Sequence, residues 1–131
     1  MFIDASAMVA MMTNEDDARS LASRMQHANV RMTSPSAIWE TAINVARILG
    51  ISIPDVAAAT RRFLVEMNIQ LMPIPEHAAF LAISAFDQYG KGRHPAQLNF
   101  GDCMAYACAR HYQLPLLFKG ENFSLTDIEA A

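Results

Sequence analysis

The chain has 131 residues, of which 53% are hydrophobic and 18% are charged, which excludes a disordered chain and allows a sizeable core. Its net charge of −3 excludes an overall positive field that would draw the protein onto nucleic acid, so an activity on phosphodiesters needs local basic patches and metal ions. We expect one domain, residues 1–131. The apolar composition, with 9 Met, also predicts an oligomer or a bound partner chain.

The first residues do not resemble a secretion signal, because they lack a basic segment and Asp4 interrupts the apolar run. No stretch approaches the roughly 20 apolar residues of a membrane span. The two cysteines, Cys103 and Cys108, fall on different faces of one predicted helix, which disfavours a disulfide or a shared metal site. We therefore expect a cytoplasmic protein with no membrane segment.

The chain opens with a short apolar strand, Phe2 and Ile3, which ends at Asp4 and is followed by the small residues Ala5 and Ser6. Ligands bind beyond the carboxyl ends of parallel strands, so Asp4 is a candidate site residue. The alternative is that Asp4 only caps the next helix, because Asp is a favoured N-cap.

Periodicity, caps and breakers predict strands that alternate with helices. In chain order, the predicted strands cover residues 2–3, 30–33, 69–74 and 114–118. The predicted helices cover residues 7–12, 14–27, 35–49, 53–67, 76–89 and 100–112, with Asn14 as the N-cap of the second and Ala79, Ile83 and Phe86 as the core face of the fifth. This order predicts an α/β fold with a mainly parallel sheet.

The helix predicted over 35–49 begins at Ser34 and Pro35, a capping hydroxyl followed by proline at the first helical position, and it ends at Gly50. Glu40 lies about one turn into this helix, on a polar stripe. Such a stripe usually faces solvent, but this helix follows a strand end. Glu40 can therefore also face the crevice beside Asp4.

The helix predicted over 100–112 carries Asp102 in its first turn, behind the N-cap Asn99. The positive helix end stabilises such an acid by roughly 0.3–1 kcal/mol, which alone explains many first-turn acids. Gly101 is harder to explain by capping, because glycine weakens a helix and instead permits close approach of backbone or ligand. The preceding loop carries Lys91 and Arg93, which either contact a substrate or belong to an ordinary solvated connection.

Three acids thus follow strand ends or precede the last strand, namely Asp4, Glu40 and Asp102, and Glu121 follows that last strand. Two carboxylates about 4 Å apart repel by about 4 kcal/mol at an effective dielectric constant near 20, so a cation or a shared proton must offset them. Oxygen ligands without Cys or His select Mg²⁺ or Mn²⁺. Such ions activate water for phosphodiester hydrolysis.

Four segments together resemble the VapC-type toxins of the PIN-domain family. They are FIDASA at 2–7, SPSAIWE at 34–40, HPAQLNFGDCMAYA at 94–107 and LFKGENF at 117–123. The resemblance spans essentially the whole chain, and the third segment is the long and specific one. It implies a PIN-like three-layer fold, with a central mainly parallel sheet flanked by helices.

The resemblance also implies a metal-dependent endoribonuclease, the toxin of a type II toxin–antitoxin pair. Asp4, Glu40 and Asp102 correspond to the acidic metal ligands, and Ser6 to a hydroxyl that supports the site. The family often has an acid pair where this chain has Glu121 and Asn122. Glu121 is therefore a candidate fourth ligand and Asn122 a supporting residue.

Partners follow from the same resemblance. It implies homodimers and a cognate VapB-type antitoxin, whose tail occupies the site, often with an arginine. The substrate it implies is RNA. Lys91 and Arg93 then become candidate RNA phosphate contacts, because their loop leads toward Asp102.

Three rival functions stay open. The first is a Mg²⁺-dependent phosphatase or phosphotransferase with Asp4 as a covalent nucleophile, although such enzymes usually have a second acid two residues on, where this chain has Ser6. The second is a PIN-like binding module without activity. The third is a hydrolase that uses Cys103 or Cys108, for which no orienting partner is evident.

Overall fold

The computed structural model describes all residues, 1–131, and its centre is a four-stranded sheet. The strands are β1 (Phe2–Ile3), β2 (Met32–Thr33), β3 (Gln70–Leu71) and β4 (Leu116–Leu117). They are ordered β3-β2-β1-β4, and every pair is parallel. The predicted α/β fold with a parallel sheet is confirmed, although the last three strands are shorter than predicted.

Six helices surround the sheet. They are α1 (Ala5–Met12), α2 (Ala18–Gln26), α3 (Pro35–Leu49), α4 (Ile53–Glu66), α5 (Glu76–Tyr89) and α6 (Phe100–Tyr112), and a short 3₁₀ helix (Phe123–Leu125) follows β4. The prediction that Asn14 caps the second helix is wrong. Asn14 adopts a positive φ of 55°, residues 14–17 form a turn, and α2 begins only at Ala18.

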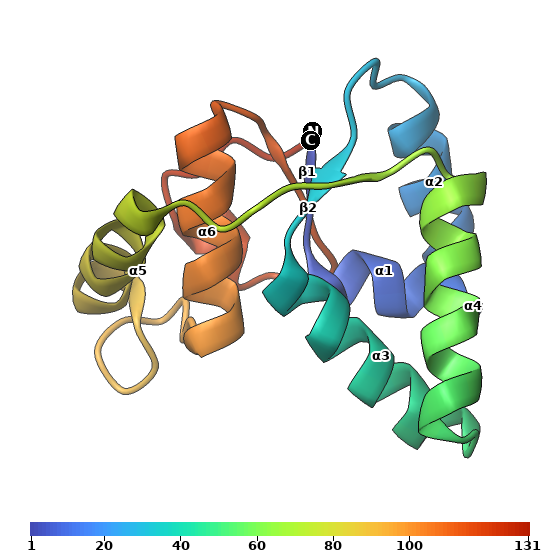
Figure 1. Cartoon of the computed structure of the whole chain (residues 1–131). Helices are drawn as coiled ribbons and strands as arrows, with labels where there is room; N and C mark the ends of the chain where they lie inside the picture. Colours follow the sequence, from blue (N-terminus) through green and yellow to red (C-terminus); the bar gives the residue numbers. More distant parts are fainter.

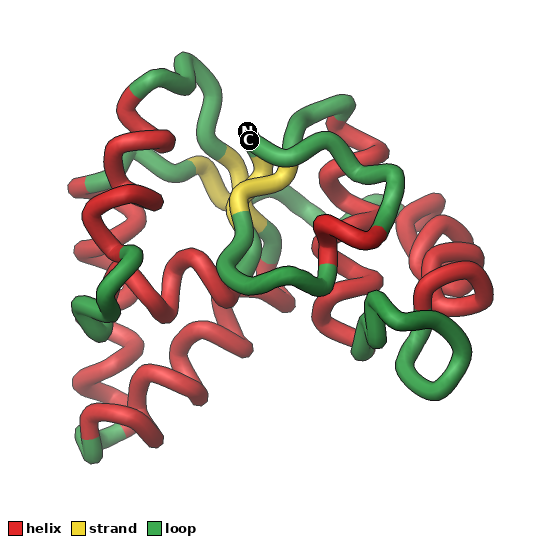
Figure 2. Tube along the Cα trace, turned by 180° about the vertical axis from the view of Figure 1, so that it is seen from behind, coloured by secondary structure: helices red, strands yellow, loops and turns green.

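The helices form two layers, one on each side of the sheet. Helices α5 and α6 lie together on one side, and α1 to α4 lie on the other (Figure 1), while the view from behind shows the short strands between them (Figure 2). Successive strand residues point to opposite faces. Phe2 and Leu116 therefore enter the core beneath α5 and α6, whereas Ile3 and Leu117 enter the core beneath α1 and α2. This is the three-layer arrangement implied by the family resemblance.

Helix α5 packs on α6 through alanines, which corrects the predicted core face. The buried residues of α5 are Ala78, Ala82 and Ala85, whereas Ile83 and Phe86 are exposed. The helix carries apolar residues on most of its circumference, so periodicity alone does not fix its orientation. Small side chains on both helices allow a close approach, because α6 also buries Ala105, Ala107 and Ala109.

No helix in the structure combines the length and apolar character that a membrane crossing requires.

Candidate active site

Asp4 stands at the carboxyl end of the central strand β1 and also caps α1. Its backbone N–H donates to Leu117 O at 2.9 Å, which fixes it against β4. One carboxylate oxygen, Oδ2, accepts hydrogen bonds from the Ser6 N–H at 3.0 Å and the Ser6 hydroxyl at 2.5 Å. The side chain is buried. The helix-cap interpretation of Asp4 is therefore confirmed, and the same side chain also lines the cavity described below.

Asp102 is fixed by a capping box at the start of α6. Its Oδ2 accepts the Asn99 N–H at 3.0 Å, and its own N–H donates to Asn99 Oδ1 at 2.9 Å. These reciprocal bonds hold the carboxylate at the helix start. The predicted cap Asn99 is thus confirmed, and Asp102 is oriented by the same contacts that begin the helix.

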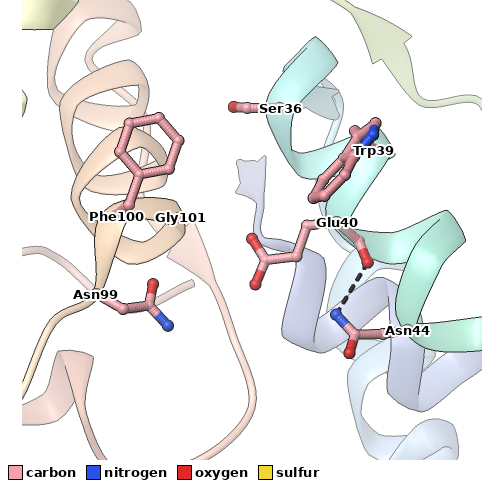
Figure 3. A pocket seen from close by; sticks show the side chains of 7 residues that line it. All are labelled: Ser36, Trp39, Glu40, Asn44, Asn99, Phe100 and Gly101. Carbon is pink, nitrogen blue, oxygen red and sulfur yellow. Dashed lines mark hydrogen bonds between the residues drawn. The ribbon is translucent and has the colours of Figure 1, made fainter. Parts of the chain in front are cut away.

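Glu40 reaches from α3 toward the first turn of α6 (Figure 3). A Cβ atom built on Gly101 would lie 2.2 Å from Glu40 Oε2, so any larger residue at this position would displace the carboxylate. This close approach explains the glycine inside the first helical turn, as the sequence analysis suggested. Gly101 therefore makes room for Glu40 between the two helices.

All three acids line one cavity of about 260 Å³ at the carboxyl ends of the strands. Its lining residues are Asp4, Ala5, Ser6, Val9, Glu15, Glu40, Asn44, Arg47, Ile48, Asp102 and Lys119. We call this space the acid cavity. It joins α1, α3 and α6, which are far apart in the sequence.

Burial and mutual repulsion make ionisation of these acids unfavourable. Burial, followed by the charges of Asp4 and Asp102, raises the pKa of Glu40 to about 6. Burial also raises the pKa of Asp102 to about 6, with the charge of Asp4 adding to it against the hydrogen bond from Asn99. Burial raises the pKa of Asp4, although the bonds from Ser6 oppose this. The cavity therefore favours a proton or a cation.

Sequence reasoning missed Lys119 as a cavity residue. Lys119 directly follows the β4 end, its N–H donates to Ser6 Oγ at 3.0 Å, and its ammonium group pairs with Glu15 and, at 3.7 Å, with Asp17. Its position after a strand end is the signal that could have identified it. Lys119 thus places one positive charge beside Glu15 at one wall of the cavity.

The remaining predicted site residues do not line the acid cavity. Glu121 and Asn122 are exposed in the turn after β4, and the Asn122 side chain makes no capping hydrogen bond. Lys91 and Arg93 lie exposed in the loop before α6, where the Arg93 guanidinium pairs with Asp87 at 2.6 Å. The roles proposed for these four residues stay predictions.

The donor atoms of the acid cavity match a hard divalent cation. Its acids offer oxygen donors, and burial, followed by neighbouring charge, raises the pKa values of Glu40 and Asp102. The Glu40 carboxylate occupies space that a Cβ on residue 101 would take. In the side-chain positions of this structure, no three His, Cys, Asp or Glu residues form a group that could hold one ion. Binding of one ion by all three acids would therefore require these side chains to move closer together.

The two cysteines are unsuited to nucleophilic catalysis. Cys103 and Cys108 are both buried, and burial raises the pKa of each thiol to about 11. A thiol is a strong nucleophile only when its pKa is lowered. The structure therefore counts against the cysteine hydrolase.

A second, larger groove of about 590 Å³ adjoins the acid cavity and shares Glu40 with it (Figure 3). Its lining residues are Ser36, Trp39, Glu40, Asn44, Asn99, Phe100 and Gly101. We call it the aromatic groove, because the exposed side chains of Trp39 and Phe100 stand on opposite walls, one on α3 and one on α6.

The chain is similar to known proteins over nearly its whole length. A model of the PIN domain family matches residues 1–129. The chain is 40% identical to a ribonuclease VapC of Mycolicibacterium smegmatis over 130 residues, or 99% of this chain and 98% of the relative. It is 36% identical to ribonuclease VapC28 of Mycobacterium tuberculosis over 132 residues, or 100% and 97%.

A solved structure shows the same fold. It is the crystal structure of Mycobacterium tuberculosis VapC20, a sarcin–ricin loop cleaving toxin, with a TM-score of 0.77, 18% identity and coverage of 99% of this chain and 97% of that chain. The sequence relatives, the family match and this fold lead to one conclusion. The chain belongs to the PIN-domain family, among the VapC-type ribonucleases.

Proposed function

We propose that the acid cavity is the active site of a metal-dependent endoribonuclease, the toxin of a type II toxin–antitoxin pair, with Asp4, Glu40 and Asp102 as the ligands of Mg²⁺ or Mn²⁺. The observation that carries this proposal is the shared cavity. Three acids from three separate elements line it, and burial, together with neighbouring negative charge, raises the pKa of Glu40 and Asp102 to about 6. Acids with raised pKa values that share one cleft are typical of functional sites.

The surrounding residues hold the acids for this chemistry. Ser6 fixes one oxygen of Asp4, the Asn99 backbone fixes one oxygen of Asp102, and Gly101 leaves the Glu40 carboxylate room to turn inward. A bound divalent cation would offset the carboxylate charges and stabilise the charge that develops on the phosphodiester oxygens. Lys119 forms ion pairs with Glu15 and Asp17 at another wall of the cavity.

Two protein partners complete the proposal. A VapB-type antitoxin would place a basic side chain of its tail against the acid cavity, which is the charge that the cavity favours. A second copy of the chain would pack on the α5 wall of the apolar groove between α5 and α6 and leave the Phe100 ring open. This groove has about 510 Å³ and is lined only by hydrophobic residues, Ala79, Ala82, Ile83, Phe86, Phe100, Cys103 and Met104. Such a groove is unusual on a monomer surface.

The test compares the wild type with Asp4→Asn, which keeps the size of the side chain and removes its charge. Expression of the wild type should arrest growth, and the purified protein should cleave RNA with Mg²⁺ or Mn²⁺ and stop with a chelator. Asp4→Asn should reduce cleavage by at least about 100-fold, since even outer-shell changes at metal sites cost 10–100-fold. Cleavage that survives both the chelator and Asp4→Asn would contradict the proposal.

The same samples decide between the nuclease and the phosphotransferase. A nuclease leaves no covalent intermediate, whereas a phosphotransferase forms a phospho-aspartate on Asp4. Mass spectrometry of the wild type after incubation with phosphorylated substrate would detect it. A trapped phospho-aspartate without RNA cleavage would favour the rival.

A further inference from the structure

The aromatic groove carries two of the most exposed aromatic side chains of the protein. Trp39 is 68% exposed on α3, and Phe100 is 76% exposed on α6. Large aromatic residues lose favourable burial when they stay in water, so a pair on facing walls indicates a surface kept open for a ligand. Figure 3 shows the two rings on opposite sides of the groove, with the Glu40 side chain between and below them.

Polar side chains also line the groove, which distinguishes it from an apolar docking surface. Asn99 uses its Oδ1 to accept the Asp102 N–H, and its Nδ2 makes no hydrogen bond within the protein. Ser36 contributes a hydroxyl, at 3.0 Å from the Ser34 hydroxyl. Asn44, by contrast, is occupied by Glu40 O and the Arg47 guanidinium. A ligand between the rings would therefore meet the Asn99 Nδ2 on one side and the Ser36 hydroxyl on the other (Figure 3).

The aromatic groove lies directly beside the acid cavity. Glu40 lines both spaces, so a group in the aromatic groove lies next to the acids. A nucleobase has the matching properties. It has two flat faces that stack on aromatic side chains, a polar edge, and a phosphate that is joined to it through the sugar. A cavity of about 590 Å³ is large enough for one base with part of its sugar.

We propose that the aromatic groove binds an unpaired nucleobase of the RNA substrate between Trp39 and Phe100, beside the phosphodiester that is cleaved. This inference rests on the proposed function. It restricts the substrate class to single-stranded RNA or to loops, because a paired base is enclosed in its own stack and cannot enter a groove between two side chains. It also makes Trp39 and Phe100 substrate-binding residues with no part in the proton transfers.

Trp39 is the only tryptophan of the chain, so its fluorescence reports on this groove alone. The probe is a short single-stranded oligoribonucleotide of mixed sequence, added with Mg²⁺ to the Asp4→Asn protein, which should bind without cleaving. We expect quenching, and we expect one abasic substitution in the oligonucleotide to abolish it while abasic substitutions elsewhere do not. Binding seen by anisotropy without any quenching, or quenching by a basic peptide but by no RNA, would overturn the proposal.

The variants give an independent measurement. In the Asp4→Asn background, Trp39→Ala should raise the Kd for the oligonucleotide about 5- to 100-fold, the range expected for the loss of one stacked base. Trp39→Phe should recover part of the affinity. The matched control is Phe80→Ala, which removes an aromatic side chain that is 65% exposed on α5, outside the groove, and should leave the Kd unchanged.

The outcomes separate the two proposals. If the wild type cleaves RNA with Mg²⁺ or Mn²⁺ but Trp39→Ala binds the oligonucleotide as tightly as its parent, the nuclease stands and the base-binding groove is rejected. If Trp39→Ala and Phe80→Ala weaken binding equally, the effect is not specific to the groove and the inference is also rejected. If the wild type cleaves no RNA, the proposed function itself fails.

Discussion

The first turns of α6 separate two environments of opposite character. On the side that faces α3 lie the acid cavity and the aromatic groove, whereas on the side that faces α5 lies the groove lined only by hydrophobic residues. Phe100 borders both the aromatic groove and the apolar one. A single helix start thus divides a polar surface suited to chemistry from an apolar surface suited to association.

Helical spacing explains the division. Asn99 and Asp102 are three residues apart and fall on one side of the helix, while Phe100, Cys103 and Met104 are three and four residues apart and fall on another. Polar and apolar residues are mixed along the sequence here, and the helix places them on different sides. The comparison predicts that changes on one side alter cleavage and changes on the other alter assembly.

Among changes that compare the two sides of α6, the largest effect is expected on the α3 side, from Gly101→Ala. The new Cβ would displace the Glu40 carboxylate, since the two would lie 2.2 Å apart, and cleavage should fall by roughly 10–100-fold. Stability should not fall, because alanine favours a helix over glycine by about 1 kcal/mol and Glu40 is a flexible side chain. Steady-state kinetics and a thermal melt test both statements. Full activity in Gly101→Ala would contradict the role given to Gly101 in making room for Glu40.

The matching change on the α5 side is Ile83→Glu. Ile83 is 64% exposed, so the monomer should fold normally, but a charge in the apolar groove should convert a dimer to a monomer in light scattering. The control is Val65→Glu on α4, which adds the same charge at a residue that is 80% exposed and does not line the groove. A wild type that is monomeric at all concentrations would contradict the proposed homodimer.

A smaller effect is expected from pH in the absence of divalent ions. The pKa of Glu40 rises from 4.5 to about 6 and that of Asp102 from 3.8 to about 6, so the folded state binds more protons than the unfolded state between about pH 4 and pH 6. The contribution of these two acids to stability is therefore fully present below this window and is lost as pH rises through it. The melting temperature should be lower at about pH 7 than at about pH 5.

The same acids predict how a cation changes this profile. Mg²⁺ should raise the melting temperature more at about pH 7 than at about pH 5, because only ionised carboxylates bind it. The double variant with Glu40→Gln and Asp102→Asn should lose most of this pH dependence. An equal Mg²⁺ effect at both pH values would indicate binding elsewhere.

The sequence predicted the acid cavity better than the grooves around it. Asp4 follows a strand end and Asp102 follows a strong cap, and parallel strands place such positions at one edge of the sheet. Local patterns therefore suffice for the acids. The aromatic groove was not predicted, because Trp39 and Phe100 come from distant segments. They face each other across the groove only because α3 packs against α6.

The orientation of α5 shows a second limit. Apolar side chains occur around most of this helix, so the sequence alone could not tell whether Ala82 or Ile83 is buried. The choice depends on the partner helix, whose small residues favour close packing. The turn at Asn14 has a similar cause, since a backbone bond from Glu15 to Ala10 competes with an early start of α2.

The smallest effect is expected at the basic loop, which lies outside the acid cavity. Arg93 already pairs with Asp87, and exposed pairs of this kind contribute at most about 1 kcal/mol, so the guanidinium can exchange its partner for a phosphate at low cost. Lys91 makes no ion pair.

Replacing Lys91 and Arg93 by alanine in the Asp4→Asn background should weaken RNA binding for every sequence. It should also lower the slope of log Kobs against log salt by roughly 0.7 for each lost contact. Arg62→Ala, at an exposed position of α4, is the control. An unchanged slope would remove Lys91 and Arg93 from the RNA interface and leave the α3 side of α6 to bind the substrate without them.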